Sequence, residues 1–212
     1  MAEIDHIVIG ARTLEEGAAF VERVLGVKPQ AGGKHDGAGT HNLLLGLGPD
    51  CYLEVIAPDP AQPEPPHPRL FGLDDPATRL MLEAEPRLLS WVARTTSMDT
   101  VMARLGPRAG QLREMKRADL AWRFAEPPLR EAMDNLIPAL IEWKGERAGK
   151  RLHDSHLRLV ALEAEHPEVD SLRRALGERG LDEALKIQQG PHPRLIARLT
   201  GKDGVEYTLT SS

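Results

Sequence analysis

Short apolar runs alternate with polar turns along this chain. Between some of these runs lies a longer stretch in which apolar residues recur at helical spacing. The first unit reads as a strand, a helix and then three strands. A Gly-rich stretch, QAGGKHDGAGTH, follows the helix, and the turn GPD joins the last two strands. The predicted ranges are 4–11 for the first strand, 13–26 for the helix with its end signals, and 41–48 and 51–57 for the later strands.

The predicted helix carries signals at both ends. Thr13 and Glu16 form a capping box, and acidic residues in the first turn suit the positive end of a helix. Apolar residues from Ala18 to Leu25 recur at helical spacing, and Gly26 is a suitable C-terminal stop.

The same order of elements returns twice, with little sequence identity between the copies. A Pro-rich segment at 58–86 separates the first two units and reads as an extended connector, followed by a short helix. We therefore predict an α+β fold of three βαβββ modules, the first two paired into a cup-shaped mixed sheet. The expected division is a domain at 1–146, with modules at 1–57 and 87–146, and a third unit at 147–212.

Composition limits the classes of function. The chain has 212 residues, 41% of them hydrophobic, and a net charge of −5, which argues against general nucleic-acid binding. It has no apolar run long enough for a transmembrane helix, and its first residues, MAEIDH, lack the basic and then apolar pattern expected of a secretory signal. Its one cysteine, Cys51, permits no intrachain disulfide, so we expect a cytoplasmic protein.

Polar residues interrupt strands that are otherwise apolar. His6 shares a strand face with Ile4 and Val8, and Glu54 lies between Tyr52 and Ile56. When the units are aligned by their elements, Ser90 takes the place of His6, and Glu142 the place of Glu54. A buried carboxylate must be paired, hydrogen-bonded or bound to a metal. A histidine with two such carboxylates is a ligand set for a divalent cation.

Ordinary structural roles are the alternative. A single strand histidine is more often a hydrogen-bonded core residue than a ligand, and Glu54 could pair with Arg123 or Arg94. The Gly-rich stretch that holds His35, His41 and Asn42 is either a flexible loop entering a strand or the lip of a pocket with hydrogen-bonding groups.

The residues that open and close the first unit resemble a known family. DHIVIGA and YLEVIAP are similar to the vicinal oxygen chelate superfamily, and GGKHDGAGTHNLLLGLG, CYLEVIAPDP and PALIEWKG look more narrowly like bacterial glyoxalase-like domain proteins. The resemblance covers residues 1–57 well, 87–146 less closely and the C-terminal 60 loosely. It implies a cup of two modules with a divalent metal on its concave face. The corresponding ligand positions are His6, Glu54, Ser90 and Glu142, of which Ser90 departs from the usual ligand types.

We therefore expect a metal-dependent enzyme of lyase, isomerase or dioxygenase type that acts on a small oxygenated molecule. His6, Glu54 and Glu142 would bind the metal, and Glu142 or Glu54 could also act as the base. The residues expected near the substrate are His41, Asn42, Ser90, Trp91 and Arg123. The alternative is a metal-free protein of the bleomycin-resistance type that sequesters a small molecule between tryptophans.

We also expect a homodimer. An odd third module would leave a sheet edge uncovered, or the apolar helix face formed by Val169, Leu172 and Leu176.

Overall fold

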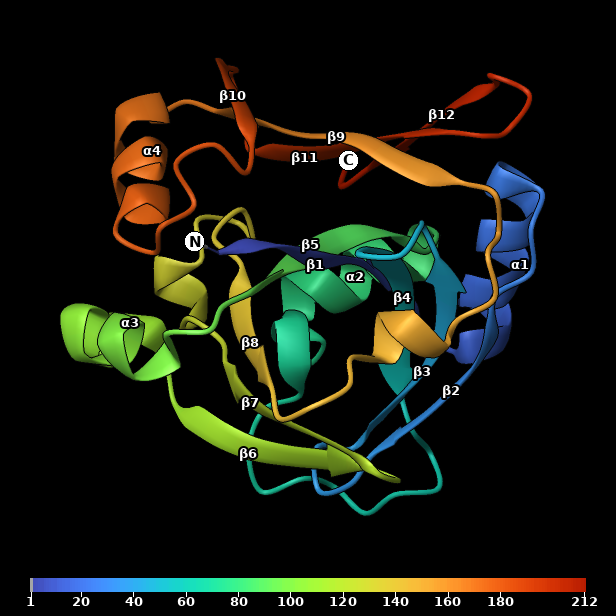
Figure 1. Ribbon diagram of the computed structural model, residues 1–212, viewed down its shortest axis with the longest axis horizontal. Coiled ribbons are helices and arrows are strands. Elements are labelled where there is room, and N and C mark those ends of the chain that lie inside the picture. Colours follow the sequence, from blue (N-terminus) through green and yellow to red (C-terminus); the bar gives the residue numbers. More distant parts are fainter. Residues whose placement is uncertain (1) are drawn as a thin grey trace.

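The computed structural model describes residues 2–212 and contains two β-sheets (Figure 1). The first two units form an eight-stranded sheet A, and the C-terminal residues form a four-stranded sheet B. The order strand, helix, three strands occurs three times, which confirms the predicted α+β class with repeated βαβββ modules.

The first unit begins with β1 and continues through a capped helix. The Thr13 hydroxyl accepts a hydrogen bond from the backbone N–H of Glu16 at 3.2 Å, and Gly26 ends the helix in the left-handed conformation, both as predicted. In the Gly-rich stretch, residues 30–35 form strand β2 and residues 36–39 form the turn that leads into β3. The elements are β1 (Glu3–Gly10), α1 (Leu14–Leu25), β2 (Gln30–His35), β3 (Thr40–Gly46) and β4 (Tyr52–Pro58).

The second unit repeats this order after the connector. The connector contains the short helix α2 (Pro76–Ala84), which Asp75 caps by accepting from the N–H groups of Ala77 and Thr78. Ser97 precedes α3, but its hydroxyl makes no capping hydrogen bond. The elements are β5 (Arg87–Arg94), α3 (Met98–Leu105), β6 (Leu112–Arg117), β7 (Leu120–Ala125) and β8 (Ala139–Trp143).

Sheet A curves into a nearly closed cup. Its strand order is β2-β3-β4-β1-β5-β8-β7-β6, with β1 parallel to β4, β5 parallel to β8, and an antiparallel β1–β5 pair joining the two modules. In Figure 1 the strands form a ring, with β1 and β5 at the top and the edge strands β2 and β6 meeting at the bottom. The interior of the cup is therefore bounded by strands of both modules.

Alternating side chains along the central strands of sheet A pack into two separate hydrophobic cores. One core fills part of the cup, where Val8 and Ile56 meet Trp122 and residues of the connector. The other lies on the outer face, where Ile7, Ile9 and their neighbours pack against α1, α3 and sheet B. Both faces of the central strands are thus covered by the same chain.

The third unit follows the module order but pairs its strands differently. In sheet B the order is β10-β9-β11-β12, so its first strand pairs with its second and third, whereas β1 pairs with β4. Figure 1 shows this sheet lying across the outer side of β1 and β5. Within residues 2–212, no helix is long and apolar enough to cross a membrane. The elements are β9 (Arg158–His166), α4 (Val169–Gly177), β10 (Lys186–Gln189), β11 (Arg194–Thr200) and β12 (Glu206–Thr210).

The apolar face of α4 is covered within the chain. Leu172 and Leu176 are buried in the outer core, and Val169 is partly buried. The uncovered helix face that motivated the expected homodimer therefore does not exist. The homodimer itself stays a prediction, as do the cytoplasmic location and the domain boundaries.

This packing predicts that the third unit contributes to global stability. Replacing Leu172, which is fully buried, with alanine should lower the free energy of unfolding by about 2–5 kcal/mol, because it leaves a cavity in the core that joins both sheets. Val160→Ala on β9, where the side chain is 64% exposed, is the matched control and should change it by less than about 0.5 kcal/mol. Urea unfolding of the full chain measures both. Equal effects of the two substitutions would contradict the packing described here.

Candidate functional site

A pocket lies inside the cup, with one polar wall and one aromatic wall. Its volume is about 390 Å³ when the open solvent at its mouth is counted. The polar residues that line it are His6, His35, Asn42, Glu54 and Arg117. The apolar lining consists of Tyr52, Leu70, Phe71, Met115, Trp122, Phe124, Ile141 and Trp143.

Two parallel strands place His6 and Glu54 side by side. In the β1–β4 register His6 stands opposite Tyr52, and Val8 opposite Glu54, so both polar side chains project into the cup. The His6 ring stacks on Tyr52 with centroids 4.4 Å apart. Its Nε2 lies 3.3 Å from Glu54 Oε2, and both side chains are almost fully buried. The sequence prediction that these two residues meet is consistent with this geometry.

Asp5 holds the other side of the His6 ring. A register irregularity in β1 between Ile4 and His6 allows adjacent side chains to meet, and His6 Nδ1 lies 2.8 Å from Asp5 Oδ1. The second Asp5 oxygen accepts a hydrogen bond from the indole N–H of Trp143 at 3.0 Å. The orientation of the imidazole is therefore fixed from the side away from the pocket.

These contacts set the charges in the pocket. Burial disfavours the imidazolium, but the hydrogen bonds to Asp5 and Glu54 outweigh it and raise the pKa of His6 to about 9. Burial likewise disfavours the carboxylate, but His6 and the Asn42 amide lower the pKa of Glu54 to about 2. At neutral pH the pair is a buried imidazolium and carboxylate.

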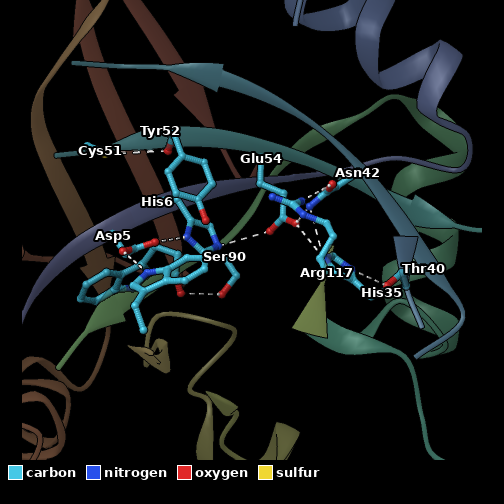
Figure 2. Close-up of polar contacts among 12 residues, drawn as sticks. Asp5, His6, His35, Thr40, Asn42, Cys51, Tyr52, Glu54, Ser90 and Arg117 are labelled. Atoms are coloured by element: carbon cyan, nitrogen blue, oxygen red, sulfur yellow. Dashed lines mark hydrogen bonds and ion pairs between the residues drawn. The ribbon is translucent and has the colours of Figure 1, made fainter. Parts of the chain in front are cut away.

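A second histidine approaches Glu54 from the opposite side (Figure 2). His35 Nδ1 lies 2.9 Å from the Thr40 hydroxyl, and its Nε2 lies 3.7 Å from Glu54 Oε1. The Asn42 amide donates to Glu54 Oε1 at 2.5 Å and also lies 3.2 Å from His35 Nε2. Burial, above all, lowers the pKa of His35, which favours a neutral ring. Glu54 is thus the centre of a small polar cluster.

The donor set of this cluster can be tested against a divalent metal. Among residues 2–212, no three His, Cys, Asp or Glu side chains are already grouped as a metal site. The donors themselves fit such an ion, because two imidazole Nε2 atoms flank one carboxylate and each Nδ1 is held by an outer partner, as in protein metal sites. A metal would replace the His6 proton and displace the Asn42 amide from Glu54.

Glu142 does not belong to this cluster. The expectation that it binds a metal together with His6 and Glu54 is therefore wrong. Ile141 and Trp143 of β8 face the pocket, so Glu142 between them faces outward. There its Oε2 accepts from Arg123 Nε at 2.7 Å, and its Oε1 accepts from the backbone N–H of Met98 at 3.2 Å. Glu142 therefore supplies the α3 end with the hydrogen bond that Ser97 does not make.

Of the residues expected near a substrate, Asn42 alone lines the pocket. Trp91 is buried in the outer core, where its indole N–H donates to the Leu136 carbonyl at 2.9 Å. Arg123 pairs with Glu142 and Asp99 on the outer face. His41 points toward Asp59 at 3.8 Å. Ser90 is buried, and its hydroxyl lies 3.5 Å from the Trp91 carbonyl. None of these four residues lines the pocket, so the expectation that they lie near the substrate is corrected.

Sequence reasoning left His35 out of the expected ligand set and missed Arg117. The glycines around His35 suggested a loop, although Asp36-Gly37 is a hairpin signal that could have indicated strands on both sides. Arg117 lies at the end of β6, and its role depends on β6 meeting β2, which no local pattern reports.

The charge state of His6 generates a testable prediction. Titration of the histidine ring signals by NMR should give His6 a pKa of about 9 in the wild-type protein. Glu54→Gln removes one charged hydrogen-bond partner and should lower this pKa by at least about one unit. Because the folded-state pKa is raised, the stability contributed by His6 is fully present below about pH 6.5 and is lost as the pH rises through about 9.

Glu142→Gln is the control for this titration, because Glu142 lies on the other face of the sheet and should leave the His6 pKa unchanged. A wild-type His6 pKa near 6.5, or equal effects of both substitutions, would contradict the assigned geometry.

Comparisons with known proteins agree with this fold. A family model described as a glyoxalase-like domain matches residues 4–180. No curated protein matches the sequence. A solved structure of a hypothetical protein from Staphylococcus aureus has a TM-score of 0.58 at 14% identity, over 98% of this chain and 85% of that one.

Two solved epimerases are similar to part of this chain. Methylmalonyl-CoA epimerase from Mycobacterium tuberculosis has a TM-score of 0.43 at 15% identity, over 68% of this chain and 89% of that one. A Streptomyces coelicolor methylmalonyl-CoA epimerase in complex with 2-nitronate-propionyl-CoA has a TM-score of 0.46 at 16% identity, over 68% and 98% respectively. The match of the family model over most of the chain, on a cup built from paired βαβββ modules, shows that the protein belongs to the glyoxalase-like domain family.

Proposed function

We propose that the cup is the active site of a small-molecule enzyme that binds one divalent metal through His6, His35 and Glu54. The observation that carries this proposal is the arrangement around Glu54, toward which both imidazole Nε2 atoms are directed while both Nδ1 atoms are held elsewhere. In this ligand set His35 replaces Glu142, which was the third ligand expected from the sequence.

The outer partners support this assignment. Asp5 fixes the His6 ring, and the Thr40 hydroxyl fixes the His35 ring, so each Nε2 lone pair can face a common position beside Glu54. The bound metal would act as a Lewis acid that polarises an oxygen of the substrate. The reaction we propose is of lyase, isomerase or dioxygenase type on a small oxygenated molecule.

Glu54 fits the role of a ligand better than that of a base. Its contacts with His6 and Asn42 lower its pKa to about 2, and a carboxylate of so low a pKa takes up a proton weakly at neutral pH. The aromatic wall formed by Trp122, Trp143 and Phe124 faces this cluster and would exclude water from it.

Metal binding by the purified full chain tests the proposal. We expect one equivalent of a divalent ion such as Zn²⁺ or Mn²⁺ per chain, measured by equilibrium dialysis and elemental analysis. His6→Ala, His35→Ala and Glu54→Ala should each weaken binding by a factor of about 100 or more, because a ligand is lost. Affinity should rise between pH 7 and 9, since a proton must leave His6.

Glu142→Gln is the matched control and should bind the metal as the wild type does. Absence of binding across several divalent ions, or a loss caused by Glu142→Gln as large as that caused by Glu54→Ala, would contradict the proposed site.

The aromatic wall favours a second candidate, a metal-free protein that binds a small molecule. The ring centroids of Trp122 and Trp143 lie 5.2 Å apart. The Trp122 and His35 rings meet edge to face, with centroids 6.5 Å apart. Saturable quenching of tryptophan fluorescence by a small molecule in a protein that binds no metal would favour this candidate.

A further inference from the structure

Arg117 carries a charge in the pocket that the neighbouring side chains do not neutralise. It is partly buried at the end of β6, and its Nη1 donates to the Asn42 side-chain oxygen, an uncharged acceptor, at 3.0 Å. Within residues 2–212, no carboxylate lies within 4.0 Å of its guanidinium nitrogens, in contrast to Arg123 and Arg69, which are each held by two acidic residues.

The carboxylates in and beside the pocket already have hydrogen-bonding partners. Asp5 is held by His6 and the Trp143 indole, and Glu54 by His6 and the Asn42 amide. Arg117 itself lines the pocket. The polar wall therefore contains one cation without an anionic partner.

The guanidinium group has donors left for a planar anion. Arginine carries five N–H donors in a fixed fork, and Asn42 takes one of them. A carboxylate matches this fork in a bidentate pair. A doubly charged phosphate would suffer more repulsion from Asp5 and Glu54, so a carboxylate is the better match.

The opposite wall specifies the rest of the ligand. Trp122 and Trp143 lie against each other, Phe71 meets the edge of Phe124 with centroids 6.2 Å apart, and flat aromatic surfaces of this kind favour a ligand with a flat apolar body. Figure 2 shows Arg117 beside Asn42 and His35, on the same side of Glu54. An acid group at Arg117 would place the adjoining atoms of the ligand beside Glu54.

We propose that Arg117 is the anion-recognition residue of the pocket and that the substrate class is a small carboxylic acid with an aromatic or other flat apolar body. This inference rests on the proposed function insofar as the cup is the small-molecule site, but it does not depend on the metal.

A substitution at Gly33 of β2 offers a second way to perturb Arg117. A Cβ atom at position 33 would lie 2.6 Å from Arg117 Cδ, so the absence of a side chain there lets the arginine stem cross the seam between β2 and β6. Gly33→Ala should therefore move the guanidinium without removing its charge.

Binding of matched probes tests the proposal. Tryptophan fluorescence and calorimetry on the full chain would compare phenylacetate with phenylacetamide, its neutral analogue, in the presence of EDTA. We expect the wild type to prefer the acid by about tenfold or more. Arg117→Met should abolish this preference, Arg117→Lys should retain part of it, and Gly33→Ala should reduce it.

Lys116→Met is the matched control, because it removes one positive charge from the adjacent, exposed position of β6 and should leave the preference intact. Equal binding of acid and amide by the wild type, no binding of the acid up to about 10 mM, or equal losses in Arg117→Met and Lys116→Met would overturn the proposal. If Arg117→Met does not fold, Arg117→Lys and Gly33→Ala still decide the question.

The metal and the acid preference can fail separately. A preference for the acid that persists in EDTA, in a protein that binds no metal, would support Arg117 and refute the metal site. One bound metal with no preference for the acid would do the reverse.

Discussion

A carboxylate buried inside the cup has to be neutralised, and the polar wall of the pocket is built around that requirement. Glu54 is 4% exposed, and four different strands supply the groups that surround it: His6 from β1, His35 from β2, Asn42 from β3 and Arg117, through Asn42, from β6. An isolated carboxylate there would cost several kcal/mol. The same contacts connect the two modules, because Arg117 reaches Asn42 across the seam where the edges of sheet A meet. The charge of Glu54 thereby links the closure of the cup to the chemistry of the pocket.

Regular alternation made part of this site predictable. On β1 and β4 one polar residue interrupts an apolar face, and the strands are adjacent and parallel, so His6 and Glu54 meet. The same reasoning failed for β8 because the alignment of modules assumed that the carboxylate, rather than Trp143, faces inward. The cross-strand partner of Glu142 is Arg123, whose neighbours Trp122 and Phe124 face the pocket, and that alternation on β7 was visible in the sequence. Reading β7 and β8 together would have placed the Arg–Glu pair outside.

Other features depend on long-range geometry and carry no local signal. The order of elements in the third unit suggested another module like the first two. In the structure, sheet B of this unit covers the outer face of β1 and β5, and its strands pair in a different order from those of the first two units. Arg117 has the spacing of an exposed edge-strand residue and becomes a pocket residue when β6 meets β2. The family resemblance was readable from short motifs, whereas the departure of the second module from the expected ligand set was not.

The ring nitrogens of the two histidines report most directly on the central claim that Glu54 lies between two Nε2 atoms available to a metal. Long-range ¹H–¹⁵N NMR spectra of the full chain can follow these atoms as one equivalent of Zn²⁺ is added. The account predicts that His6 and His35 keep the Nδ1 proton shared with Asp5 and Thr40, while both Nε2 resonances move to positions typical of metal-bound imidazole. Nε2 resonances of His6 and His35 that do not change, while those of an exposed histidine such as His153 or His156, outside the pocket, respond, would contradict it.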